Sequence, residues 1–186
     1  STKQMIAPES FTKEWINSHK KEKQFSRINP PVLEKMIRAL ALLEALAIYN
    51  LKFIFIVGTS LILLLPEPRR FSVDIDILTE HSREELETAF NKIIVSGTFK
   101  SWELDEPRSY KEGVPKAHYF FYFDPQLNKN AGYILLDVLF EKHQYPKVTV
   151  TPVRSNWVKV AGEPITVEVP TIESILGDKL TAFAPN

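Results

Sequence analysis

Residues 70–77 (RFSVDIDI) alternate strictly between polar and apolar side chains. This alternation is typical of a β-strand with one buried face, because successive side chains point to opposite faces. The apolar residues are expected to enter the core. The polar residues share the other face: Arg70, Ser72, Asp74 and Asp76. The segment therefore predicts a strand at 71–78 that holds two carboxylates on one face, about 6.8 Å apart.

Two aspartates on one strand face need an explanation, because Asp is depleted in strands. Asp74 and Asp76 could be the solvated face of a half-exposed strand, since acidic pairs are common on surfaces. They could also converge on a hard cation. Mg²⁺ binds through one or two carboxylates together with substrate phosphates, so the pair is also what a phosphoryl-transfer site needs.

A short loop, Gly58-Thr59-Ser60, separates a predicted strand at 53–57 from a predicted short helix at 60–65. Glycine lets the backbone approach a phosphate closely, and a helix N-terminus offers free N–H groups. Thr59 and Ser60 add hydroxyl donors. The same three residues also form an ordinary helix entry, and the sequence alone leaves both interpretations open.

Two further charged residues lie in apolar surroundings. Asp137 interrupts a strongly apolar predicted strand, where a carboxylate is costly unless a partner or a neighbour on an edge strand bonds to it. Lys179 lies in the middle of the apolar stripe of a predicted last helix at 171–183. Such a lysine either extends outward to water or reaches an anionic partner in a cleft.

The composition excludes several classes of protein. Cysteine is absent, which excludes disulfides, zinc fingers, iron–sulfur clusters and a thiol nucleophile. Lys+Arg and Asp+Glu number 23 each, so no global positive field attracts nucleic acid or membrane. The eight basic and four acidic side chains of residues 1–38 fit a solvated helical face better than a polyanion site.

No membrane span or targeting segment is expected. The longest mostly apolar run, residues 53–65, is shorter than the ~18–20 residues that a span needs. The first thirty residues mix Lys and Glu without an apolar block. We therefore expect a cytoplasmic protein.

The pattern of elements predicts an α/β or α+β fold with a mixed central β-sheet flanked by helices. Besides the elements above, we expect helices at 30–49 and 83–95. Strands are expected at 98–104, 117–124, 132–141, 147–151, 157–160 and 165–169. We divide the chain into an N-terminal helical segment, 1–50, and a core, 51–186. Phe120 to Phe123 are expected in the core rather than as a base-stacking platform. Their spacing marks His19, His81, His118 and His143 as ordinary surface or strand residues.

The order of these motifs resembles one family. Gly-Thr-Ser, the Arg-Phe-Ser-Val-Asp-Ile-Asp strand, a later strand Asp and the Ile-Leu-Gly-Asp-Lys-Leu-Thr-Ala-Phe helix together resemble the AbiEii/AbiGii-type nucleotidyltransferases. These are minimal members of the DNA polymerase β-like nucleotidyltransferase superfamily, and many are toxins of bacterial toxin–antitoxin or phage-abortive-infection systems. The resemblance covers about residues 53–183 and implies the nucleotidyltransferase fold.

The resemblance also implies residue roles. Asp74, Asp76 and Asp137 would hold Mg²⁺ or Mn²⁺ ions that bridge the phosphates of an NTP, and Asp137 would also serve as a base. The nucleotide would be contacted by the remaining polar residues: Gly58, Thr59, Ser60, Arg70, Ser72 and Lys179. The role of Arg70 follows from strand parity rather than from the family.

The implied reaction moves an NMP from an NTP to an acceptor hydroxyl, with RNA such as a tRNA 3′ end as acceptor and an antitoxin as partner. The sequence departs from the family in two places. Val57 stands where the family usually has the first of two glycines, and relatives continue into a helical C-terminal part that we expect to be absent here. These departures leave open a silent nucleotide-binding protein that acts through a partner. Nucleotidyl transfer to a protein or small molecule also stays open, because the superfamily that the sequence resembles includes such acceptors.

Overall fold

The computed structural model describes residues 3–20, 29–56, 74–127, 132–142 and 147–171. Within these ranges the strands form a seven-stranded sheet in the order β3-β4-β5-β2-β1-β7-β6. Their bounds are β1 Ile54–Phe55, β2 Asp74–Thr79, β3 Ser101–Leu104, β4 Lys116–Phe123, β5 Gly132–Phe140, β6 Val148–Pro152 and β7 Thr166–Pro170. The helices are α1 Lys13–Lys20, α2 Pro30–Ile48 and α4 Arg83–Val95, with 3₁₀ turns η1 Pro8–Phe11 and η2 Glu106–Arg108.

Local sequence explains where the two long helices begin. Pro30 and Pro31 occupy the first turn of α2, where a missing N–H costs nothing. In α4 the side chain of Ser82 accepts a hydrogen bond from the N–H of Glu85, and the Glu85 carboxylate reaches back to Ser82. This reciprocal capping box satisfies two free donors of the first turn. The predictions of helices at 30–49 and 83–95 are confirmed.

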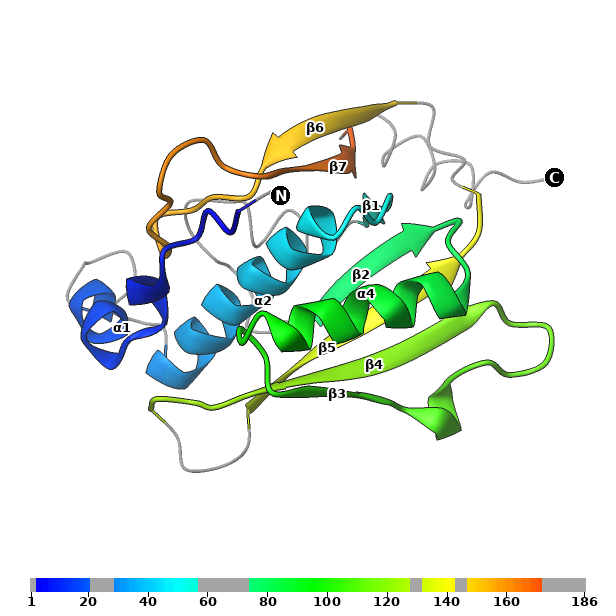
Figure 1. The fold of residues 1–186 in the computed structure, drawn as a ribbon, viewed down its shortest axis with the longest axis horizontal. Coiled ribbons are helices and arrows are strands. Elements are labelled where there is room, and N and C mark those ends of the chain that lie inside the picture. The colour runs from blue at the N-terminus through cyan, green and yellow to red at the C-terminus, as the bar shows by residue number, and fades with distance from the viewer. Residues whose placement is uncertain (1–2, 21–28, 57–73, 128–131, 143–146, 172–186) are drawn as a thin grey trace, which may run out of the picture.

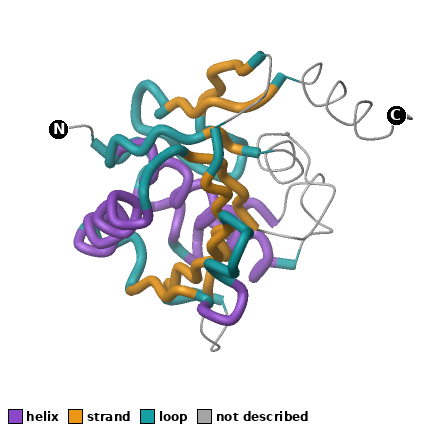
Figure 2. The backbone as a smooth tube through the Cα atoms, turned by 90° about the vertical axis from the view of Figure 1, so that its right-hand side faces the viewer, coloured by secondary structure: helices purple, strands orange, loops and turns teal. Residues whose placement is uncertain are grey.

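The sheet is mixed, as expected. β2 pairs with β5 in parallel, and β1 pairs with β7 in parallel, whereas all the other pairs in the described part are antiparallel. Seen from the side in Figure 2, the strands run through the middle of the molecule. The parallel pair β2–β5 lies at the centre of the order.

Helices α2 and α4 cover one face of the sheet (Figure 1). Phe90 of α4 contacts the rings of Tyr119 and Phe121 edge-on, at centroid distances of 4.9 Å. Ile75 and Ile77 of β2 are also fully buried, as the alternation predicted. Asp74 and Asp76, which have the opposite parity, are only half-buried. The acidic face is therefore the one turned away from the aromatic contacts of α4.

The N-terminal segment packs into the same core as the sheet. Ile6 forms an isolated β-bridge with Val160, and the indole N–H of Trp15 donates to the carbonyl of Trp157 (2.7 Å). One hydrophobic cluster of the described residues includes Ile6, α2 and the sheet. The division of the chain at residue 50 stays a prediction.

Most predicted strands are found with shifted ends, but one is wrong. Residues 157–160 form a turn in which Trp157 and Val158 are buried and only Val160 makes a bridge. Their apolar character comes from packing against the core rather than from strand pairing. β3 begins later than predicted, because Gly97, at φ +89°, turns the chain first.

The predicted helices at 60–65 and 171–183 lie outside the described residues, as does part of the predicted strand at 71–78. No helix within the described ranges is long and apolar enough to cross a membrane.

Candidate active site

The parallel pairing of β2 with β5 brings two predicted site residues side by side. Asp76 lies opposite Asp137, and Asp74 lies opposite Leu135. Residues that are opposite each other on adjacent strands project from the same face, and the strands are about 4.8 Å apart. Three carboxylates from two distant segments of the chain therefore share one face of the sheet.

Asp137 lies in the interior of the sheet, because β5 has β4 on one side and β2 on the other. Its neighbours along the strand, Leu136 and Val138, are buried, whereas the Asp137 side chain is 25% exposed. An edge-strand position for Asp137 is thus wrong. A neighbour does bond to it, and that neighbour is a histidine on β4.

His118 lies directly opposite Asp137 in the antiparallel pair β4–β5. Its ring Nδ1 is hydrogen-bonded to Oδ1 of Asp137. His118, Asp137 and Asp76 therefore form one row across three adjacent strands. The interpretation of His118 as an ordinary strand residue missed this contact. Its alternation with the apolar residues of β4 gave its face, but no sequence signal gave its partner.

The chain leaves β1 directly beside Asp76. The backbone N–H of Ile56 donates to the carbonyl oxygen of Asp76 (2.9 Å). Gly58 follows two residues later but lies outside the described residues. The same holds for the other predicted nucleotide contacts: Thr59, Ser60, Arg70, Ser72 and Lys179.

The donor chemistry of the acidic face fits a hard divalent cation. Carboxylate oxygens are the ligands that Mg²⁺ and Mn²⁺ prefer, and Asp76 and Asp137 lie in register on adjacent strands. Among the described residues, no group of three or more His, Asp or Glu side chains is close enough to hold a metal ion. Asp76 and Asp137 lie in register on adjacent strands, and Asp74 lies two residues before Asp76 on β2.

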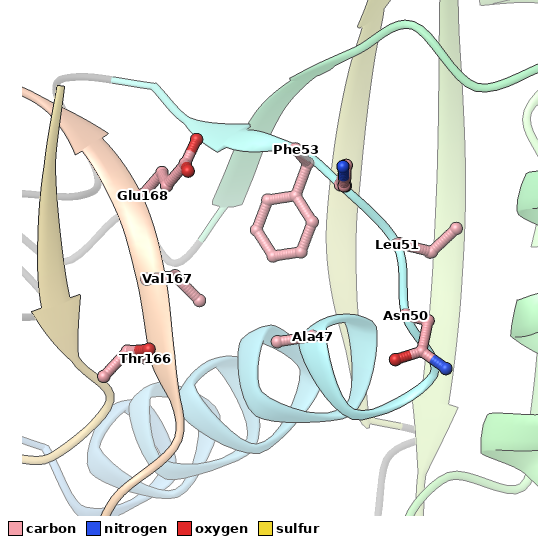
Figure 3. A pocket seen from close by; sticks show the side chains of 8 residues that line it. Ala47, Asn50, Leu51, Phe53, Thr166, Val167 and Glu168 are labelled. Atoms are coloured by element: carbon pink, nitrogen blue, oxygen red, sulfur yellow. The ribbon is translucent and has the colours of Figure 1, made fainter. Parts of the chain in front are cut away.

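A separate cavity of about 410 Å³ lies between β1, β7 and the end of α2 (Figure 3). Its lining residues are Ala47, Asn50, Leu51, Lys52, Phe53, Thr166, Val167 and Glu168. It opens at the start of β1, whereas Asp76 lies beside Ile56, after the end of that strand. Asp74, Asp76 and Asp137, the predicted site residues that the structure describes, do not line it.

Comparison with family models identifies the family to which the chain belongs. The model of the nucleotidyl transferase AbiEii toxin, of type IV toxin–antitoxin systems, matches residues 39–186. The chain belongs to the AbiEii family. The match includes Asp74, Asp76 and Asp137, and it begins within α2. The resemblance inferred from the motifs is therefore confirmed for this AbiEii chain.

Two solved structures are similar to the AbiEii chain. JHP933 from Helicobacter pylori is 17% identical, with a TM-score of 0.48, over 80% of this chain and 55% of that one. A candidate nucleotidyltransferase from H. pylori is 16% identical, with a TM-score of 0.48, over 80% of this chain and 56% of that one. The chain thus spans little more than half the length of either protein. No curated protein matches it.

Proposed function

We propose that this chain transfers an NMP from an NTP to an acceptor hydroxyl, with Mg²⁺ or Mn²⁺ as the metal. The observation that carries the proposal is the register of Asp76 with Asp137 on adjacent parallel strands, with Asp74 on the same face. Membership of the AbiEii family supports the same reaction.

In the proposed reaction, the acceptor oxygen attacks the α-phosphorus, the bond between the α-phosphorus and the bridging oxygen breaks, and pyrophosphate leaves. Asp74 and Asp76 would hold the metal from β2. The metal would supply charge neutralisation at the phosphates during transfer. Asp137 is the third carboxylate, and one of its oxygens takes the proton of the acceptor hydroxyl. The carboxylates are held by a sheet, which suits a reaction that depends on positioning.

Contacts to the nucleotide are assigned by family resemblance. Gly58, Thr59 and Ser60 are proposed to line the triphosphate, and the hydrogen bond from Ile56 to Asp76 supports this, since it ties β1 to the acids two residues before Gly58. Three further side chains are proposed to contact phosphate or the nucleotide: Arg70, Ser72 and Lys179.

The acceptor and the partner are finer proposals. We assign RNA, such as a tRNA 3′ end, as the acceptor and an antitoxin as the protein partner, in keeping with the toxin–antitoxin family. The reaction is placed in the cytoplasm, where NTPs are available. Transfer to a protein or small molecule, and nucleotide binding without transfer, are the competing functions that the experiment separates.

The test measures transfer of label from each α-³²P NTP, with Mg²⁺, into total bacterial RNA and total protein. The Asp76→Asn variant is expected to lose transfer by about 10²-fold or more, since a metal supplies several kcal/mol of transition-state stabilisation. The matched control is Asp124→Asn, because Asp124 is an exposed aspartate that pairs with Lys100 (3.0 Å). This control should label like the wild type.

Three results are informative. Label in RNA that Asp76→Asn lacks supports the proposed reaction and identifies the NTP. Label only in protein reassigns the acceptor. NTP binding without label in any fraction favours the silent nucleotide-binding function, and full transfer by Asp76→Asn would refute the metal-site assignment.

A further inference from the structure

We propose that His118 is the positioning residue of Asp137: through one hydrogen bond it fixes the carboxylate in the orientation that metal binding and transfer require. This inference rests on the proposed function, and it adds to the site a residue that none of the sequence motifs contains. His118 itself touches neither metal nor nucleotide in this proposal.

The contact has a defined direction. Oδ1 of Asp137 can only accept when the carboxylate is ionised, so the hydrogen must be on Nδ1 of His118. An aspartate side chain has two rotatable bonds, and fixing one oxygen restricts both of them. In this proposal Oδ1 accepts the hydrogen bond from His118. Oδ2 is then the oxygen that binds the metal or takes the proton of the acceptor hydroxyl.

The arrangement of strands makes this restriction necessary. Asp137 has His118 on the β4 side and Asp76 on the β2 side. Like charges that lie opposite each other on adjacent strands repel, so the carboxylate of Asp137 is pushed toward β4. Nδ1 of His118 lies on that side and fixes one oxygen there, which limits how far the carboxylate can turn when no metal is bound.

The backbone of His118 is itself held firmly. Its N–H donates to Oγ of Ser109 (2.9 Å), and its carbonyl accepts from the N–H of Asp105 (2.8 Å) and from Oγ of Ser109 (3.3 Å). Ser109 is buried. These bonds use only main-chain atoms of His118, so its ring remains available for the hydrogen bond to Asp137. They also hold the backbone from which the ring projects.

The pair affects both stability and geometry. The side chains of His118 and Asp137 are 16% and 25% exposed, so the hydrogen bond is mostly shielded from water and contributes to folding. Partners that orient a metal ligand also change metal affinity by about 10–100-fold. Metal affinity and transfer in folded variants therefore separate the positioning role from a merely structural one.

Three substitutions of His118 test whether the position of the hydrogen-bond donor matters or only the presence of a side chain of similar size. His118→Asn keeps an N–H donor, because the amide nitrogen of Asn, like Nδ1 of His, is bonded to Cγ. His118→Leu has a similar branched shape without a donor, and His118→Gln carries its donor one bond further out. The control is His81→Leu, since His81 forms a comparable pair with Glu85 (2.7 Å) at the start of α4.

The first measurement is Mn²⁺ binding by the full chain without nucleotide, followed by electron paramagnetic resonance. We expect His118→Leu and His118→Gln to weaken binding about 10-fold or more. His118→Asn and His81→Leu should stay within about 2-fold of the wild type. In NTP transfer, His118→Leu should lose kcat by a similar factor, whereas the KM for NTP should change little.

The second measurement needs no metal. Long-range ¹H–¹⁵N spectra of the histidine rings should show His118 as the Nδ1–H tautomer, assigned by the signal that His118→Asn lacks. This preference should disappear in Asp137→Ala. Thermal melting of each variant checks that it is folded, and His118→Gln replaces His118→Leu if the latter does not fold.

Wild-type Mn²⁺ affinity and kcat in both His118→Leu and His118→Gln would overturn the inference, and so would an Nε2–H tautomer in the wild type. A wild type that binds no Mn²⁺ and transfers no label would refute the proposed function, and the positioning role with it. An active wild type with all three His118 variants equally impaired would overturn the positioning role alone, since the position of the donor would then not matter.

Discussion

Glu44 is a buried carboxylate on α2 that holds the N-terminal segment. It accepts hydrogen bonds from the backbone N–H groups of Met5 (3.2 Å) and Ile6 (3.0 Å). Burial raises the pKa of Glu44 to about 6, although the two backbone hydrogen bonds act in the opposite direction. The folded protein therefore binds a proton more tightly at Glu44 than the unfolded chain does.

This shift predicts a pH-dependent contribution to stability. Because the folded pKa is raised, the contribution is fully present below the unfolded pKa of about 4.5 and is lost as pH rises through about 6. The size is about 2 kcal/mol for a shift of this order. The free energy of unfolding of the wild type, relative to Glu44→Gln, should fall by this amount between about pH 4 and 7 in urea titrations.

The exposed Glu14 on α1 provides the control, since Glu14→Gln removes the same charge from the surface. The difference between the wild type and Glu14→Gln should vary less with pH. A difference between the wild type and Glu44→Gln that is constant over the whole range would contradict the prediction.

Single residues of the candidate site could be recognised from sequence only where their polarity was unusual for the predicted element around them. Asp137 stood out because a carboxylate in an apolar strand is costly. His118 did not, because a histidine on a half-exposed strand face violates nothing. The contact of His118 with Asp137 depends on the register of β4 with β5, which no local pattern of the sequence contains.

At the scale of elements, β4 divides its aromatic residues between the two faces of the sheet. Tyr119, Phe121 and Phe123 are buried, whereas Phe120 and Tyr122 are only half-buried. The expectation that residues 120–123 form core is therefore confirmed for every second residue. The alternation of a strand requires this division, because four consecutive residues cannot face one side.

The division predicts unequal costs for two neighbouring phenylalanines. Phe121 is fully buried and contacts Phe90 (4.9 Å) and Phe99 (5.7 Å) edge-on, so Phe121→Ala should lose about 3–5 kcal/mol of unfolding free energy. Phe120→Ala, on the other face, should lose clearly less. Urea unfolding followed by circular dichroism measures both, and equal losses would show that the two faces are not packed as described.

The capping box of α4 predicts a second local effect. Ser82→Ala removes the acceptor for the N–H of Glu85 (3.1 Å) and should cost about 1 kcal/mol. Ser82→Gly should lower the free energy of unfolding by only a few tenths of a kcal/mol, because glycine is itself tolerated at the N-cap position. Thermal melting that ranks the glycine variant below the alanine variant would contradict the capping interpretation.

At the scale of the whole molecule, the sequence predicted elements better than their assembly. Alternation assigned the faces of β2, and helical periodicity placed α2 and α4 almost to the residue. The strand order and the parallel pairing of β2 with β5 depend on contacts between distant segments, so periodicity cannot supply them. The meeting of Asp76 and Asp137 was therefore expected from family resemblance alone.

The same limit applies to residues 3–20, which precede the residues matched by the AbiEii family model. Ile6 is fully buried, Ala7 N–H donates to the carbonyl of Lys159 (2.7 Å), and Ala161 N–H donates to that of Met5 (2.8 Å). Two backbone hydrogen bonds thus join this segment to the loop before β7. We therefore expect the segment to unfold together with the sheet rather than before it.

Ile6→Ala should therefore lower the free energy of unfolding of the whole described fold by about 2–5 kcal/mol, because it removes buried methyl groups from the shared core. A single transition should be seen both by tryptophan fluorescence and by far-ultraviolet circular dichroism. Trp15 and Trp157 report on the contact between the segment and the core, since they share a hydrogen bond. An early fluorescence transition that leaves the circular dichroism of the sheet intact would instead make residues 1–50 a unit of their own.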